Sequence, residues 1–236
     1  AVRDIKNLIS YADGCMFGRY SLDNKGLVYT GGKWDPDVYK IFKADSDNII
    51  PINDDEYFGD DVVTKFVEFI QVAFGKEHLD ENIKFIADNL GIKSSGTSKD
   101  KIRKYFLNDF YKDHLKMYQK RPIYWLFDSG KENGFKALIY MHRYDENLIG
   151  KMRQNYLLPM QRRYIDQLNR EKDQVKRGII QKKLTEVERY DMAMELYSSN
   201  PVSIDLDDGV KVNYAKFQNI ENSKSSKDKI DLLYKI

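Results

Sequence analysis

Apolar residues recur every three to four positions through much of this chain, a spacing typical of helices that bury one face. Near the N-terminus, Ile5, Leu8, Ile9, Ala12 and Met16 share such a face and predict a helix ending near Gly14 or Gly18. Capping residues and a proline bound three further expected helices, from residue 60 or 61 to 74, from about 80 to 90, and from 97 or 98 to the residue before Pro122.

After Pro122 the pattern changes to aromatic and branched residues. Residues 123–127 and 135–141 predict two antiparallel strands joined by the polar loop 128–134. Small hairpins are expected at 19–29 and, around Asp207, Asp208 and Gly209, at 202–214. Residues 31–59 predict a long surface loop, and the Ser- and Lys-rich end from Asn222 predicts a frayed tail.

Two long helical stretches are expected between about Asn147 and Tyr197, with a break near Gly178. Their apolar positions can face each other, which predicts an antiparallel helical hairpin. The expected seam consists of Met152, Tyr156, Leu157, Met160, Tyr164 and Leu168 on the first helix and Ile180, Leu184, Val187, Met194 and Leu196 on the second.

Together these patterns predict a mainly helical α+β fold, with amphipathic helices, short antiparallel β-hairpins and a long antiparallel helical hairpin. The expected division is a helical domain with small β-hairpins at 1–144, the helical hairpin at 145–200, and a β-hairpin with the tail at 201–236.

Composition narrows the classes of function. The 236 residues carry 39 Lys and Arg and 37 Asp and Glu, so any contact with nucleic acid must come from local patches. The single cysteine, Cys15, suits a small buried position and a reducing cytoplasm. The sequence has no secretory signal and no apolar run of membrane-spanning length, and it begins within a helical pattern at Ala1, as a segment cut from a longer polypeptide would.

Residues that could carry catalysis are scattered. His78, His114 and His142 share no metal-ligand spacing, and the first two are expected on helix surfaces. Ser129, Gly130 and Lys131 lack the flanking residues of a phosphate-binding loop and predict a strand turn. The sequence therefore predicts no catalytic residue, no metal site and no cofactor site, and a nuclease would need a carboxylate–lysine cluster that is missing.

Basic residues interleaved with aromatic ones form the remaining functional pattern. The candidates for contact with DNA phosphates are Lys112, Lys116, Lys120, Arg121, Lys131 and Arg143, near Tyr124 and Trp125. An alternative stays open, in which the cations complement the dipole of a helix C-terminus and the aromatic rings belong to the core.

Several stretches are distinctive beyond their composition. They are residues 8–23 (LISYADGCMFGRYSLD) with 26–29 (GLVY), residues 110–116 (FYKDHLK) with 120–127 (KRPIYWLF) and 137–144 (ALIYMHRY), and residues 205–214 (DLDDGVKVNY). In the same order, they resemble the region downstream of the methyltransferase core in PglX-type proteins of BREX phage-defence systems, which are related to fused type II restriction-modification enzymes.

The resemblance implies that the intact protein is an adenine-specific (N6) DNA methyltransferase that uses S-adenosylmethionine. The motifs for cofactor and catalysis lie upstream in that family and have no counterpart here. This chain would be the C-terminal, non-catalytic part that binds or positions double-stranded DNA, with its own upstream methyltransferase domain and other defence-system proteins as partners. The alternative is a structural or protein-interaction module, which an exposed apolar stripe on the 150–197 hairpin would support.

Overall fold

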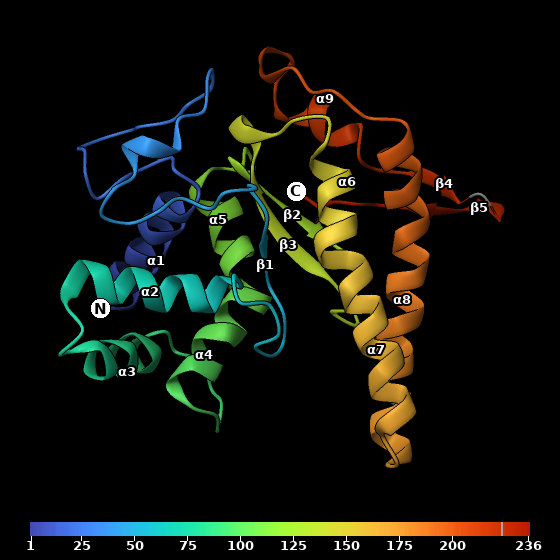
Figure 1. The fold of residues 1–236 in the computed structure, drawn as a ribbon, viewed down its shortest axis with the longest axis horizontal. Coiled ribbons are helices and arrows are strands. Elements are labelled where there is room, and N and C mark those ends of the chain that lie inside the picture. The colour runs from blue at the N-terminus through green and yellow to red at the C-terminus, as the bar shows by residue number, and fades with distance from the viewer. Residues whose placement is uncertain (223) are drawn as a thin grey trace. The chain divides into compact units, whose positions relative to one another are not determined.

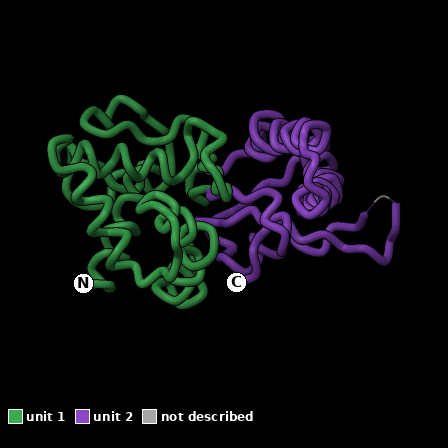
Figure 2. Tube along the Cα trace, turned by 90° about the horizontal axis from the view of Figure 1, so that it is seen from below, with its two compact units in different colours: residues 1–123, 139–143 green, residues 124–138, 144–236 purple. Residues whose placement is uncertain are grey.

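The chain divides into two compact units in the computed structural model, which describes residues 1–222 and 224–236. Unit 1 is Ala1–Ile123 with Ile139–Arg143, and unit 2 is Tyr124–Leu138 with Tyr144–Ile236 (Figure 2). The elements form a mainly helical α+β fold with two small sheets (Figure 1), as the sequence predicted.

Unit 1 is built mainly from helices. They are α1 (Val2–Met16), α2 (Val62–Phe74), α3 (Leu79–Asn89), α4 (Ser98–Tyr105) and α5 (Tyr111–Met117), with the π-helical turn η2 (Phe106–Phe110) between the last two. Short 3-10 turns, η1 (Pro36–Val38) and η3 (Met141–Arg143), and the strand β1 (Ile50–Pro51) complete it. α1 packs against α2 and α3, and α2 also packs against α4. The buried face of α1 includes Ile9, Ala12 and Met16, as expected from their spacing.

The predicted caps explain where the helices of unit 1 begin. The Asp61 carboxylate accepts a hydrogen bond from the backbone N–H of Thr64 at 2.9 Å, and so caps α2. Thr97 and Asp100 form a reciprocal capping box at the start of α4. Both caps lie where the sequence placed them.

The hairpin predicted at 19–29 is wrong, since the structure has no strand there. The Val28 N–H still donates to the Arg19 carbonyl across this segment at 2.9 Å. Its centre is bound to a later part of the chain, because the Asp23 carboxylate accepts hydrogen bonds from the N–H groups of Lys40 and Ile41 at 2.8 and 3.0 Å. The segment 31–59 is irregular, as expected, but it is more than a surface loop. It contributes the core side chains Tyr39, Phe42, Ile49, Ile50 and Ile52.

Residues 139–143 complete unit 1 from far along the chain. The Asn48 side-chain amide donates to the Tyr140 carbonyl and accepts from the Tyr140 N–H, both at 3.0 Å. The Tyr140 hydroxyl donates to the Tyr29 carbonyl at 2.7 Å. The last strand of the unit therefore closes on segments about 90 to 110 residues earlier.

Unit 2 combines strands with the long helical hairpin. Its elements are β2 (Tyr124–Asp128), α6 (Leu148–Met152), the π-helical turn η4 (Arg153–Leu157), α7 (Leu158–Arg170), α8 (Gln174–Ser199), the 3-10 turn η5 (Leu206–Asp208), α9 (Val210–Ala215), β4 (Ile220–Asn222) and β5 (Ser225–Ile230). The strand β3 (Lys136–Tyr140) is shared between the units, and the three-stranded sheet has the order β1-β3-β2. The strands β4 and β5 pair antiparallel, with Ile220 opposite Ile230.

The helical hairpin is confirmed, with α7 packed against α8 and both Leu157 and Leu184 buried. Its break lies at residues 171–173 rather than near Gly178. There the Asp173 side chain caps α8, and the Arg177 guanidinium donates to the carbonyls of Leu168 and Glu171 at the end of α7. A single glycine weakens a helix by only about 1 kcal/mol, so α8 runs through Gly178. Leu196 is exposed and does not belong to the seam.

The C-terminal expectations need two corrections. The hairpin predicted at 202–214 is η5 followed by α9, because the Asp205 side chain accepts from the Asp207 N–H and the Asn213 side chain donates to the carbonyls of Asp205 and Gly209. The tail is not frayed either. Leu232 and Leu233 are buried, and the backbone of residues 232–234 pairs with β2, as in the 2.8 Å bond from the Tyr234 N–H to the Leu126 carbonyl.

Candidate nucleic-acid contact surfaces

Four of the predicted phosphate contacts lie on α5 and in the turn after it. Lys112 and Lys116 are one helical turn apart on α5, and Lys120 and Arg121 follow. All four are exposed, and none forms an ion pair within the described part of the chain. The name "α5 cations" is used below for Lys112, Lys116, Lys120 and Arg121.

The turn after α5 has a defined geometry. Gln119 and Lys120 both adopt positive φ, 50° and 59°. The backbone N–H of Lys120 reaches back to the Leu115 carbonyl at 2.8 Å, and that of Arg121 to the Tyr118 carbonyl at 2.8 Å. This closes the helix and places two cations consecutively on the surface.

The turn after α5 packs on the aromatic side chains of Tyr118 and His114, and Arg19 contacts Tyr118. The Arg19 guanidinium lies 5.6 Å from the Tyr118 ring centre and donates to the Tyr118 hydroxyl at 2.8 Å. His114, expected on the surface, is buried, and burial together with the nearby charge of Arg19 lowers its pKa to about 3. The Ile123 N–H donates to Nε2 of His114 at 3.3 Å, which requires that this nitrogen carry no proton.

Arg143 lies in a different environment of unit 1. Its guanidinium stacks 3.5 Å above the Trp34 ring centre and donates to the Phe17 carbonyl at 3.1 Å and the Ser46 carbonyl at 3.4 Å. Desolvation lowers its pKa below the usual value for arginine. These contacts give Arg143 a structural role in holding three segments together, and a DNA contact by it stays a prediction.

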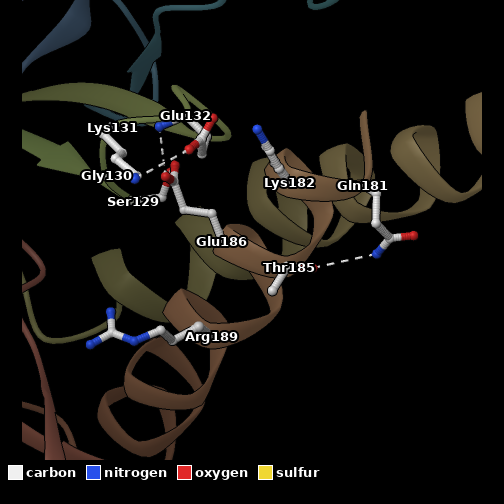
Figure 3. A pocket seen from close by; sticks show the side chains of 9 residues that line it. All are labelled: Ser129, Gly130, Lys131, Glu132, Gln181, Lys182, Thr185, Glu186 and Arg189. Atoms are coloured by element: carbon white, nitrogen blue, oxygen red, sulfur yellow. Dashed lines mark hydrogen bonds and ion pairs between the residues drawn. The ribbon is translucent and has the colours of Figure 1, made fainter. Parts of the chain in front are cut away.

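Lys131 belongs to unit 2, on the loop between β2 and β3. Its side chain is 90% exposed, with its Nζ 3.8 Å from the Glu132 carboxylate. The loop folds around the carboxylate of Glu186 on α8, which accepts hydrogen bonds from the Ser129 hydroxyl at 2.6 Å and the Glu132 N–H at 2.7 Å (Figure 3). The same carboxylate accepts from the Gly134 N–H at 3.0 Å. The backbone donors that a phosphate could have used are therefore occupied by a side chain of the protein itself.

The loop and α8 enclose a shallow hollow of about 440 Å³ (Figure 3). Its charged lining is Lys131, Glu132, Lys182, Glu186 and Arg189. The Arg189 guanidinium is held by the Asp228 carboxylate at 2.5 Å, which leaves Lys131 and Lys182 as the hollow's exposed cations. The two exposed lysines of this lining can hold an anion.

Glu186 was not recognised from the sequence, because the groups it binds lie 52 to 57 residues away. Replacing Glu186 with alanine is expected to lower the free energy of unfolding by about 1–3 kcal/mol, because two backbone donors and a buried hydroxyl lose their acceptor. Glu188→Ala, an exposed change two residues along α8, is the control and should cost under about 0.5 kcal/mol in denaturant titrations. Equal losses in the two variants would contradict this account of the loop.

The described residues also bear on metal binding, thiol chemistry and membrane insertion. They contain no group of three or more His, Cys, Asp or Glu side chains that could hold a metal ion. Cys15 is buried, as expected, and desolvation raises the pKa of its thiol to about 11. Within the part of the chain that the structure covers, none of the helices combines the length and the apolar character needed to cross a bilayer.

Comparison with known proteins identifies two relatives of this chain. No protein-family model matches it. It is 48% identical over 233 residues to the adenine-specific methyltransferase PglX of Lacticaseibacillus casei (strain Zhang), a match that covers 92% of this chain and 19% of that protein. It is 45% identical over 238 residues to the adenine-specific methyltransferase BrxX of Escherichia coli O9:H4 (strain HS), covering 90% of this chain and 20% of BrxX.

These identities confirm the resemblance seen in the sequence motifs. The chain spans about one fifth of the length of the curated relatives it matches. With close to half of the residues identical over nine-tenths of its own length, this chain is homologous to a part of the PglX- and BrxX-type adenine-specific methyltransferases.

Proposed function

We propose that this chain is the C-terminal part of an adenine-specific DNA methyltransferase and that it binds and positions double-stranded DNA without carrying the catalytic core. The observation that supports this most directly is the group of α5 cations, four exposed positive charges within ten residues that have no acidic partner among the described residues. Cations free of internal ion pairs are suited to neutralise phosphates, because they lose no existing partner on binding.

The chemistry of the family makes a separate holding surface useful. An enzyme that modifies a base must take it out of the stack, which costs a few kcal/mol, so the duplex has to be gripped while the base is flipped. In this proposal the methyltransferase domain, with S-adenosylmethionine as cofactor, lies in the remainder of the polypeptide. The present chain supplies sequence-independent contacts to the DNA backbone, within a cytoplasmic phage-defence system.

The helix dipole explains the α5 cations only in part. A positive side chain is favoured in the last turn of a helix, which accounts for Lys116. Lys112 lies in the first turn of α5, and Lys120 and Arg121 lie beyond its end. Lys131 and Arg143 stay predicted contacts, with Arg143 the weaker of the two because its guanidinium is already engaged.

A second function is favoured by a different observation. Val175 and Ile179, one turn apart on α8, are 74% and 53% exposed. Exposed aliphatic side chains on a hairpin suit a module that braces the methyltransferase core or docks another defence protein. Ile165 on α7 and Leu196 on α8 are also exposed, at 41% and 43%, but Leu196 lies 17 residues beyond Ile179. Such scattered side chains differ from the continuous stripe that a docking module would present, so DNA binding is the function we propose first.

The test is a quadruple variant, Lys112→Gln, Lys116→Gln, Lys120→Gln and Arg121→Gln, measured by fluorescence anisotropy with short duplexes. Each lost phosphate contact should flatten the plot of log affinity against log salt by about 0.9, so up to about 3.6 for four contacts, equally for unrelated sequences. The matched control removes the same charge from the exposed lysines Lys25, Lys76, Lys93 and Lys99.

Two results would overturn the proposal. One is a parent chain that does not bind duplex DNA even at low salt. The other is a folded quadruple variant whose salt dependence equals that of the control. A loss confined to one DNA sequence would instead assign these residues to base recognition.

A further inference from the structure

The charges of the α7–α8 hairpin are unevenly distributed along its length. Residues 158–183, which form α7, the connecting turn and the first part of α8, carry eight Lys and Arg and three Asp and Glu. Residues 184–199, the remainder of α8, carry one basic residue (Lys or Arg) and four acidic residues (Asp or Glu). The end of the hairpin next to the turn is therefore strongly basic in a chain whose formal net charge is only +2.

Two of the three acidic side chains at this end are engaged with the backbone. The Glu171 carboxylate accepts from the N–H groups of Lys172 and Asp173, both at 2.9 Å. The Asp173 carboxylate caps α8 by accepting from the Lys176 N–H at 2.9 Å. They serve the turn, and they do not pair with the neighbouring cations.

Five of the basic side chains are exposed and form no ion pair within residues 1–222 and 224–236. These hairpin-end cations are Arg162, Arg170, Lys172, Lys176 and Lys182. Arg177 differs from them, because its guanidinium is bound to the carbonyls of Leu168 and Glu171 and holds the turn. The seam beneath is firm, with Met160, Tyr164 and Leu184 buried.

Folding does not account for this arrangement. Like charges close together on a helix repel, and Lys176 lies in the first turn of α8, where the helix dipole disfavours a positive charge. Farther from the turn, the cation of residues 184–199 is paired, because the Arg189 guanidinium donates to the Asp228 carboxylate at 2.5 Å. Positive charge is thus left unpaired at one end only.

We infer that the end of the α7–α8 hairpin is a second surface for the phosphate backbone of duplex DNA, independent of the α5 cations. The inference rests on the proposed DNA-binding function. At a rise of about 1.5 Å per residue, the two arginines on α7 lie roughly 12 Å apart along the helix axis, and the two lysines on α8 lie roughly 9 Å apart. A duplex presents one negative charge for about every 1.7 Å of its axis, so its phosphates are dense enough to match cations at these spacings along the hairpin.

The test replaces all five hairpin-end cations with glutamine in the full chain. Affinity for duplex DNA at moderate salt should fall at least tenfold, and the slope of log affinity against log salt should flatten by about 2 to 4, equally for unrelated duplexes. The control with equal charge loss is the set Lys25, Lys76, Lys93 and Lys99 with Lys211→Gln added, all of them exposed. A second variant swaps each Lys for Arg and each Arg for Lys at the five positions, and it should bind like the parent.

The outcomes separate this inference from the proposed function. If the glutamine variant binds like its control while the α5 variant is weakened, the hairpin end is not a DNA surface and the proposed function stands. If the parent does not bind duplex DNA, both fall. A variant that keeps DNA binding but loses binding to polyglutamate would overturn the inference in favour of an acidic protein partner at the hairpin-end cations.

Discussion

Replacing Asp61 with alanine is expected to lower the free energy of unfolding by about 3–5 kcal/mol, because it leaves the guanidinium of Arg103 buried without its counter-ion. The Asp61 side chain is fully buried and that of Arg103 is 8% exposed. The guanidinium donates to the Asp61 carboxylate and, at 3.2 Å, to the Asn53 carbonyl. One carbonyl cannot compensate a buried positive charge.

The control for Asp61 is Asp173, because both residues cap a helix through the N–H of the residue three positions later. Asp173 is exposed, so Asp173→Ala should cost only the cap, about 1 kcal/mol. Urea titrations of the two variants isolate the effect of the buried pair. The assignment is wrong if Asp61→Ala costs no more than Asp173→Ala. Replacing Arg103 with methionine in the Asp61→Ala background should recover part of the loss.

The second large effect is an opposed pH dependence of two buried groups in unit 1. Burial raises the pKa of the Asp13 carboxyl well above its usual value of 3.8, and neither of its oxygens has a hydrogen-bond partner. Burial lowers the pKa of His114 from 6.5 to about 3. Above pH 3.8 the unfolded chain therefore releases the Asp13 proton, whereas the native state keeps it. Below pH 6.5 the unfolded chain protonates His114, whereas the native state keeps this side chain neutral until the pH approaches 3.

The two groups act on stability with opposite signs. The contribution of Asp13 is present below pH 3.8 and is lost as the pH rises, whereas that of His114 is present above pH 6.5 and is lost as the pH falls toward 3. Above pH 3.8 and below pH 6.5 the two effects therefore oppose each other in the parent.

Single variants should uncover each slope. Relative to the parent, Asp13→Asn should gain stability as the pH rises from 5 to 7, and His114→Gln should gain about 2 kcal/mol as the pH falls from 7 to 5. Urea titrations at four pH values measure both differences, and His78→Gln, at an exposed position, is the control. Parallel pH profiles for parent and variants would show that these groups titrate alike in the folded and unfolded chain.

Local signals in the sequence predicted a large part of the fold. The caps at Asp61 and Thr97 begin helices where their spacing from the apolar face requires it, and the seam around Leu157 and Leu184 follows from helical periodicity. These features depend on residues within a few turns of one another. Some turn residues are found both in hairpin turns and before helices. At Asp207, Asp208 and Gly209 the sequence is compatible with either structure, and we predicted the hairpin where the structure has η5 and α9.

Features that depend on distant partners were missed for a physical reason. Nothing near Asp23, Asn48 or Glu186 in the sequence shows that each binds backbone groups 17, 92 or more than 50 residues away. The same limit applies to the cations. The sequence shows that Lys120 and Arg143 are charged, but only the structure shows that Lys120 is free and that Arg143 is stacked on Trp34.

The division of β3 between the units has a consequence for synthesis on the ribosome. Unit 1 is completed by Ile139–Arg143, which are made only after β2 and the loop that belong to unit 2. At roughly 5–20 residues per second, the nascent chain must hold the first 123 residues without their closing strand for about a second or more. A chain that stops between residues 124 and 138 would contain every α-helix of unit 1. It would still lack Tyr140, whose backbone N–H and carbonyl both bind the side-chain amide of Asn48.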